Sequence, residues 1–263
     1  MALGADLQTD VGVYFCAWYG LYLCGGVVCR GLFSTYGTLK KDAQAYWCAS
    51  FVSSVHAVVI VYLAYTAGRD LEVWSSARDD GAFFATSARS SLANRVFLGY
   101  LLSDLTTSLY YNRAWSGWVE NILHHVSGIA CWYTLERDAF GHLFLLTALL
   151  CEATTPFVNN RWFFAQAGMK TSTLYFVNGL VMTFLWFTLR VVMFGWLGYR
   201  IFVLRAALAS LSLWQALVMA WSFVVGYGLQ LFWFRKILKG AIKALFPPPP
   251  AVKKGFLVDA KAD

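Results

Sequence analysis

Long apolar runs are the feature of this sequence that most constrains its fold. A helix that crosses the hydrocarbon core of a bilayer needs about 20 mostly apolar residues. Roughly seven such stretches take up most of the 263 residues, so we expect one integral membrane domain and no separate soluble domain. The spans predicted from hydropathy cover residues 11–33, 48–67, 92–111, 120–135, 140–158, 172–196 and 207–234. The predicted fold class is therefore all-α, a polytopic bundle of about seven transmembrane helices.

The low charge content excludes the water-soluble classes. Only 13% of the residues are charged and 59% are hydrophobic, whereas soluble domains carry about 25% charged and 45–50% apolar residues. The net charge of +7 would also fit a nucleic-acid partner. The Lys and Arg residues, however, lie between and after the apolar stretches, which favours contact with a membrane surface and no nucleic acid.

The distribution of basic residues predicts the orientation. With seven crossings, most of the 21 Lys and Arg residues face the cytoplasm if the N-terminus lies on the other side. The segment Met1–Asp10 is acidic and lacks the basic start of a signal peptide, so we expect the first span to be retained. The polar loop of residues 68–89 is mixed in sign and resembles a solvated lumenal or extracellular loop. After the last span, Arg235–Lys243 forms a basic amphipathic stub that the prolines Pro247–Pro250 end.

Ionisable side chains inside the spans mark the candidate site, because such groups are costly in a bilayer and are usually functional. The chain has few of them: His56, Asp104, His124, His125, Glu152 and Arg190.

The vicinal pair His124–His125 is the most specific of these features. Neighbouring helical residues point about 100° apart, so the two rings do not chelate one metal, and helical metal pairs favour i,i+4 spacing. The sequence therefore predicts no metal site. One imidazole can instead act as nucleophile or general base while the other orients it. The alternative, that the rings only hydrogen-bond between helices, stays open.

Asp104 lies on a polar stripe of the third span. Residues at positions 0, +4, +7, +8 and +11 share one helical face, which we expect to point into the bundle. Asp104 either orients a histidine, as a carboxylate does in hydrolase triads, or ties two helices together. The stripe consists of Tyr100, Asp104, Thr107, Ser108 and Tyr111.

Glu152 lies four residues before Pro156, which removes a backbone donor and predicts a kink that opens room at membrane depth. His56 could contribute from the second span. For Arg190, the sequence leaves open whether it caps its span, reaches the interface or pairs with Glu152.

The ordered set of these motifs resembles the TLC domain, shared by the TRAM, Lag1 and CLN8 proteins, over roughly residues 40–240. The string from Glu152 to Phe163 is most similar to the small TLC domain-containing proteins and less similar to the ceramide synthases. The motifs are Ser50…His56, Gly99-Tyr100…Asp104, His124-His125 and Glu152…Thr155-Pro156-Phe157…Asn159.

The resemblance implies a three-part organisation. Residues 1–36 hold the N-terminal segment and the first span, residues 37–244 form the TLC domain, and residues 245–263 are a cytoplasmic Pro-rich basic tail. Six helices would form a barrel-like bundle around a lipid-accommodating cavity. It also implies a location in the endoplasmic reticulum, with the N-terminus lumenal and the C-terminus cytoplasmic.

In the ceramide synthase branch, the vicinal histidines transfer an acyl chain from acyl-coenzyme A to a long-chain amine. By resemblance, His124 and His125 are catalytic, with Asp104 in support. The partners are membrane lipids and fatty acyl chains, with acyl-coenzyme A as co-substrate and no bound cofactor. The predicted substrate-binding residues are His56, Tyr100, Ser108, Tyr111, Glu152 and Asn159.

This sequence departs from the ceramide synthases after the histidine pair. The stretch Gly141–Leu150 lacks the His-Asp-x-x-Asp element of that branch. Three functions therefore stay open: a lipid acyltransferase, a non-enzymatic lipid-binding regulator of membrane composition, and a proton-coupled carrier. A carrier fold is usually built from internal repeats, and none is visible in the sequence, so the carrier ranks last.

Overall fold

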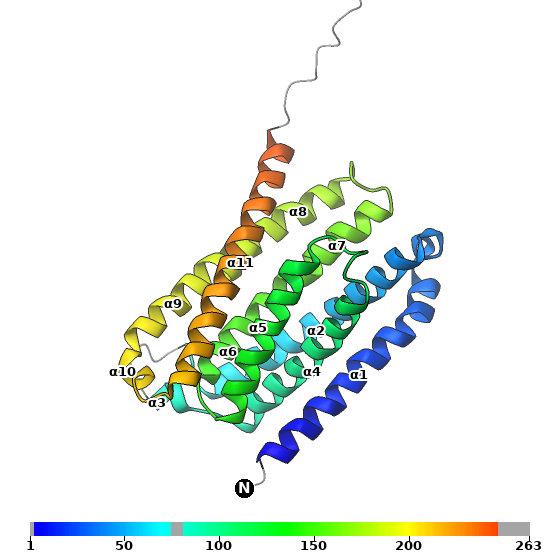
Figure 1. Ribbon diagram of the computed structural model, residues 1–263. Coiled ribbons are helices and arrows are strands. Elements are labelled where there is room, and N and C mark those ends of the chain that lie inside the picture. Colours follow the sequence, from blue (N-terminus) through cyan, green and yellow to red (C-terminus); the bar gives the residue numbers. More distant parts are fainter. Residues whose placement is uncertain (1–2, 75–80, 247–263) are drawn as a thin grey trace, which may run out of the picture.

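The computed structural model describes residues 3–74 and 81–246, and these residues form helices and no strand (Figure 1). Seven long helical segments run side by side, and two of them contain a short irregular stretch in place of regular α-helix. They are α1 (Leu3–Leu32), α2 (Lys41–Asp70), α4 (Ala88–Tyr110), α5 (Trp118–Arg137), α6–η2–α7 (His142–Leu149, Leu150–Thr154, Thr155–Gln166), α8–η3–α9 (Thr173–Leu185, Trp186–Val192, Met193–Val203) and α11 (Leu213–Leu245). The short elements η1 (Ser34–Thr38), α3 (Gly81–Phe84) and α10 (Arg205–Leu208) lie between them.

Each predicted span falls on one of these seven segments, so the predicted all-α bundle is confirmed. The first helix begins earlier than predicted, at Leu3, and includes Asp10. An acidic residue is tolerated there because the Asp10 carboxylate accepts a hydrogen bond of 2.6 Å from Arg95 Nη1 on α4. At the other end, α11 continues through the predicted basic stub to Leu245. The proline run 247–250, the tail beyond it and residues 75–80 of the predicted polar loop lie outside the described residues.

The outer surface of the bundle suits a lipid environment. Four segments are long and apolar enough to cross a membrane by themselves: residues 7–32, 41–70, 173–203 and 213–245. Large apolar side chains are exposed on their outer faces, including Val27 (81% exposed), Val58 (67%) and Val224 (68%). Such an exposed apolar surface is unusual for a protein in water. The remaining segments, α4, α5 and α6–η2–α7, also carry buried ionisable side chains, among them His125, Glu136 and His142.

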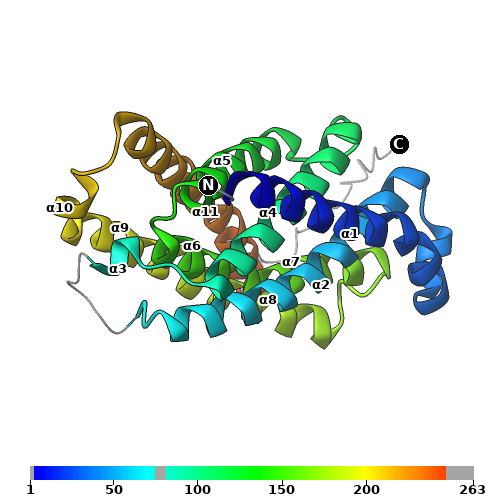
Figure 2. The same ribbon diagram turned by 90° about the horizontal axis from the view of Figure 1, so that it is seen from below.

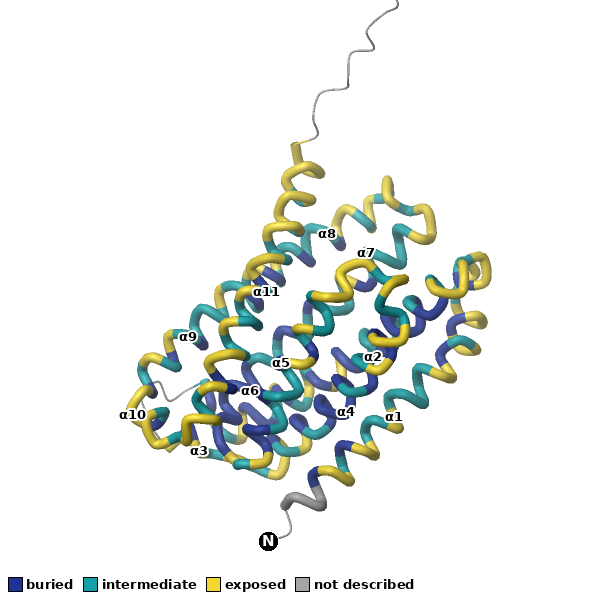
Figure 3. The backbone as a smooth tube through the Cα atoms, viewed as in Figure 1, coloured by how far each residue is buried: buried dark blue, intermediate teal, exposed yellow. Residues whose placement is uncertain are grey.

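α1 lies outside the bundle formed by the other six segments. It packs along α4 and α2 and leaves most of its surface exposed (Figures 2 and 3). The contact with α4 is close because Gly99 has no side chain there. A Cβ atom on Gly99 would lie 2.5 Å from Tyr14 Cβ and 2.7 Å from the backbone nitrogen of Phe15. One glycine thus sets the approach of α1 to the bundle.

Local signals in the sequence determine where the helices begin. α4 and α11 each start with a capping box, formed by Ser87 with Ser90 and by Ser212 with Gln215. Between α5 and α6 the chain turns at Gly141, whose φ of 68° favours glycine. These caps satisfy backbone groups that would otherwise be unpaired at the helix ends.

The end of the bundle that holds α3 and α10 is tightly packed (Figure 1). Phe83, Leu143 and Leu204 are fully buried there. Close to them, Glu136 of α5 accepts hydrogen bonds from Arg95 Nε (2.9 Å) and from the side-chain amide of Asn94 (3.1 Å) on α4. Apolar packing and a paired carboxylate therefore close this end.

The close approach at Gly99 leads to a first prediction. We expect Gly99→Ala to lower the melting temperature of the detergent-purified protein, because overpacking against backbone typically costs about 1–3 kcal/mol. The matched control is Gly20→Ala on α1, where a Cβ would meet nothing within 4 Å. Gly20→Ala should leave the melting temperature unchanged or raise it. A Gly99→Ala protein as stable as the control would contradict this packing.

Candidate functional site

A cavity of about 980 Å³ lies among six of the seven segments. Its walls come from α2, α4, α5, η2–α7, α8–η3 and α11, and no described residue of α1 lines it. Its mouth lies at the end where α5 begins and α11 ends, opposite the tightly packed end (Figure 1). The arrangement agrees with the expectation of six helices around a cavity.

A second, smaller cavity of about 100 Å³ continues toward the packed end. Its lining is mostly apolar and comes from α5, α6, α9 and α11, with residues such as Cys131, Phe144 and Leu197. Five residues line both cavities and mark their junction: Phe97, Leu101, His124, Glu152 and Arg190. His124 and Glu152 thus lie where the larger cavity, which has many polar side chains in its wall, meets the smaller, mostly apolar one.

His125 is held in one orientation by its two ring nitrogens. Nδ1 lies 2.8 Å from the backbone carbonyl of Asn121, and Nε2 lies 2.9 Å from Oδ2 of Asp104 on α4. A carbonyl oxygen only accepts, so Nδ1 carries a hydrogen, and Nε2 shares a second proton with the carboxyl group. The structure therefore brings together Asp104 and His125, and this one contact fits both alternatives that the sequence left open, because it orients the ring and joins α4 to α5. The Asn121 amide in turn donates to Ser108 Oγ (2.9 Å), which also lines the cavity.

His124 differs from its neighbour. Its ring lies at 90° to that of His125, with 5.6 Å between the centroids, and packs edge-on against Trp233 of α11. Within the described part of the chain, no hydrogen bond holds either of its ring nitrogens. There is also no group of three His, Cys, Asp or Glu side chains among the described residues that could hold a metal ion. His124 therefore presents a free imidazole to both cavities.

Glu152 and Arg190 form a buried pair at the junction. Arg190 Nη2 donates to Glu152 Oε1 at 3.3 Å, which selects pairing among the three alternatives that the sequence left open. Arg190 also donates from Nε to the Thr154 hydroxyl (2.7 Å) and from Nη1 to the Gln230 side chain (3.2 Å). The Thr155 hydroxyl donates to the second oxygen of Glu152 at 2.8 Å. This network connects η2, η3 and α11.

Both partners of this pair lie on irregular backbone. Glu152 lies in the 3₁₀ stretch η2, which leads directly into α7. Pro156 lies in the first turn of α7, where the sequence predicts a kink. Arg190 lies in η3, a π-helical stretch inside α8–α9. π-helical segments are rare and are frequently found at functional sites. The sequence around Arg190 carries no proline or other mark that would have predicted η3.

Two further predicted residues belong to the wall of the cavity. Tyr100 and Asn159 both line it. The Asn159 side-chain nitrogen donates to the backbone carbonyl of Ser50 and to the hydroxyl of Ser54, each at 2.9 Å, and so ties α7 to α2.

Two predicted substrate-binding residues do not line the cavity. His56 is fully buried behind Tyr100, with parallel rings 3.6 Å apart, and packs edge-on against Trp18. Tyr111 stacks on Trp115 instead of continuing the polar stripe, because α4 ends at Tyr110 and Tyr111 no longer has helical backbone. The structure thus does not bring these two side chains to the wall.

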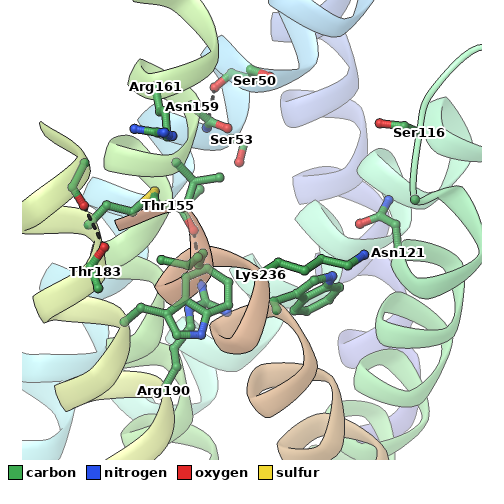
Figure 4. A pocket seen from close by; sticks show the side chains of 18 of the residues that line it. Ser50, Ser53, Ser116, Asn121, Thr155, Asn159, Arg161, Thr183, Arg190 and Lys236 are labelled. Carbon is green, nitrogen blue, oxygen red and sulfur yellow. Dashed lines mark hydrogen bonds between the residues drawn. The ribbon is translucent and has the colours of Figure 1, made fainter. Parts of the chain in front are cut away.

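Sequence reasoning missed a group of basic residues at the mouth: Arg161 of α7, Lys170 before α8 and Lys236 of α11. Arg161 stacks over the ring of Tyr175 at 4.3 Å, and Lys236 Nζ lies 3.8 Å from Glu120 of α5. In Figure 4, Lys236 extends toward the side of the cavity that carries Asn121. These charges looked like ordinary juxtamembrane residues in the sequence, and only their convergence identifies them.

Comparisons with known proteins agree with this architecture. The profile of the TLC domain (TRAM, LAG1, CLN8) matches residues 46–239, which leaves α1 outside the match. The chain is 30% identical to "TLC domain-containing protein 4-B" of Xenopus laevis over 88% of this chain and 84% of that protein. It is 25% identical to "TLC domain-containing protein 4" of Homo sapiens, over 87% and 86% of the two chains. It is 27% identical to "Topoisomerase I damage affected protein 4" of Saccharomyces cerevisiae, over 62% and 60%. No solved structure matches.

The Glu152–Arg190 pair leads to a second prediction. We expect Arg190→Leu to lower the free energy of unfolding by about 3–5 kcal/mol, because it leaves the Glu152 carboxyl group buried without its cation. The double variant Glu152→Gln/Arg190→Leu should regain part of that loss. Both values can be measured by unfolding in mixed detergent–SDS micelles. If the double variant were less stable than the single variant, the two side chains would not be coupled as described.

Proposed function

The chain belongs to the TLC-domain family, and from this premise we propose that it transfers an acyl chain from acyl-coenzyme A to an amine or hydroxyl group of a membrane lipid. The coarser statement, an integral membrane protein related to lipids at the family level, is what family membership itself gives. The acyl transfer is a proposal from the geometry of the cavity. The observation that carries it is the contrast between His125, held by Asp104, and His124, whose ring is free.

The proposed reaction uses His124 as the base. An imidazole nitrogen of His124 takes the proton of the acceptor N–H or O–H, whose nitrogen or oxygen then attacks the thioester carbonyl. The new acyl bond forms, the carbon–sulfur bond breaks, and the departing coenzyme A thiolate receives the proton from His124. His125 and Asp104 act as positioning residues. Their contact fixes α5 against α4, and their charges set the electrostatic potential at the neighbouring His124 ring.

The two cavities suit the two parts of such a substrate. A volume of about 980 Å³ is at the upper end of the range for small-molecule sites, about 300–1,000 Å³. An acyl chain would extend into the smaller apolar cavity. The thioester would lie near His124, and the phosphate groups of coenzyme A would lie near Arg161, Lys170 and Lys236 at the mouth.

A location in the endoplasmic reticulum with a cytoplasmic C-terminus is part of the proposal. The excess of Lys and Arg on one side supports that orientation. The mouth would then open toward the cytoplasm, since α11 ends on the same side.

A third prediction tests the role of His124. Full-length protein in proteoliposomes made from a total membrane lipid extract would be incubated with radiolabelled long-chain acyl-coenzyme A. We expect release of free coenzyme A together with a labelled lipid, and His124→Ala should lower both rates by about 10²–10⁴-fold. Intact-protein mass spectrometry would show whether an acyl group transiently occupies the protein.

The matched control is Lys40→Gln, an exposed position at the start of α2 that does not line the cavity. It should keep the wild-type rate. An unchanged rate in a folded His124→Ala protein would contradict the proposed reaction.

A second function, lipid binding without turnover, is favoured by one observation. In the pairs His125–Asp104 and Glu152–Arg190, the ionisable groups are each other's partners. The wall of the cavity therefore needs no ligand charge to be stable. In that case, lipid would be released from the purified protein on denaturation, and no coenzyme A would be set free in the assay above.

A further inference from the structure

The last helix is longer than a membrane span requires. α11 runs for 33 residues, Leu213–Leu245, which corresponds to about 50 Å at 1.5 Å per residue. The hydrocarbon core is about 30 Å thick, and the apolar part of α11 up to Phe234 is long enough to cross it. Residues 235–245, the terminal segment of α11, project beyond the bundle and are mostly exposed (Figures 1 and 3).

The terminal segment of α11 has three faces, because successive helical residues are rotated by about 100°. One face, built from small residues and one isoleucine, lines the large cavity: Ile237, Gly240, Ala241 and Ala244. A second face is apolar and exposed, and it consists of Leu238, Ile242 and Leu245. Since the first face is turned toward the cavity and the second is suited to lipid, the third face is left for the surroundings of the bundle.

The third face is basic and consists of Lys236, Lys239 and Lys243, with Arg235 at its edge. All four side chains are exposed. Lys236 lies close to Glu120 and the cavity mouth. Within the described residues, Arg235, Lys239 and Lys243 have no ion-pair partner, so three positive charges are available on one side of the helix.

We propose that this basic face binds the headgroups of anionic phospholipids in the leaflet around the end of α11. The adjacent row Leu238, Ile242 and Leu245 would lie among the outer parts of the acyl chains and would hold the segment at the level of the headgroups. A helix with neighbouring apolar and basic faces is typical of the membrane interface. Clusters of four or more Lys and Arg directly after a span attract anionic lipids electrostatically. A narrow apolar row of three residues offers little surface to a protein partner.

This inference does not depend on the acyl-transfer reaction. It does link the leaflet to the cavity, because the same segment carries the basic face and forms part of the wall at the mouth. Anionic headgroups gathered there would lie beside the mouth of the large cavity.

The experiment measures lipid adducts on the full-length protein by native mass spectrometry from detergent micelles, with dioleoyl phosphatidylserine or dioleoyl phosphatidylcholine as the added lipid. We expect the wild-type protein to bind phosphatidylserine in preference. Lys239→Gln/Lys243→Gln should weaken its apparent affinity by roughly 10-fold or more, since each charge near an anionic surface contributes about 5-fold. Lys239→Arg/Lys243→Arg should keep the wild-type affinity.

The matched control, Lys40→Gln/Lys41→Gln, removes two exposed charges at the start of α2 and should bind as the wild type does. The proposal is overturned if Lys239→Gln/Lys243→Gln binds phosphatidylserine normally, or if the control loses as much. It is also overturned if binding is lost only in Arg161→Gln/Lys170→Gln, which would place the lipid in the cavity mouth. Equal binding of phosphatidylcholine would exclude a role for headgroup charge.

Discussion

A charge buried among membrane helices is stable only with a partner, and this requirement determines how the bundle is held together. Three carboxyl groups, Asp104, Glu136 and Glu152, lie within the six-helix bundle, and each faces a basic side chain from another element. In a medium of low dielectric constant, an unpaired ion is far more costly than in water. The pairs therefore join α4 to α5 at two levels along their length and join η2 to η3. The relative positions of these segments, and with them the shape of the cavity, depend on those contacts.

The same pairs determine which ionisable side chains of the site are engaged and which one is free. At Glu152 and Arg190 every charged group is engaged, and the network includes two threonines and Gln230 as well. His125 is equally engaged, by Asp104 and by the carbonyl of Asn121. His124 is the exception, and it is adjacent in sequence to a ring that is fixed on both sides. In the proposed acyl transfer, His124 would be the group that meets the substrate, and the fixed His125 ring would support it.

Much of this could be predicted from the sequence, because the membrane imposes simple rules. Hydropathy alone located the seven segments, and the cost of burying charge singled out Asp104, His124, His125 and Glu152 as residues of one site. The failures have physical causes. Asp10 was assigned to a polar N-terminal segment because its partner Arg95 lies 85 residues away. The polar stripe of α4 was extended to Tyr111 because periodicity does not show where a helix ends. The basic residues at the mouth could not be recognised, since charges at span ends occur in every membrane protein.

The packing at one end of the bundle has a consequence for the membrane leaflet with which the cavity would exchange lipid. Phe83, Leu143 and Leu204 fill the space between the helices at that end, and the smaller cavity above them is mostly apolar. Among the described residues, a headgroup in the larger cavity would meet mostly apolar side chains in the direction of that end. In the proposed acyl transfer, the acceptor lipid and its acylated product would both pass the mouth at the other end, so the product would stay in the leaflet of the acceptor.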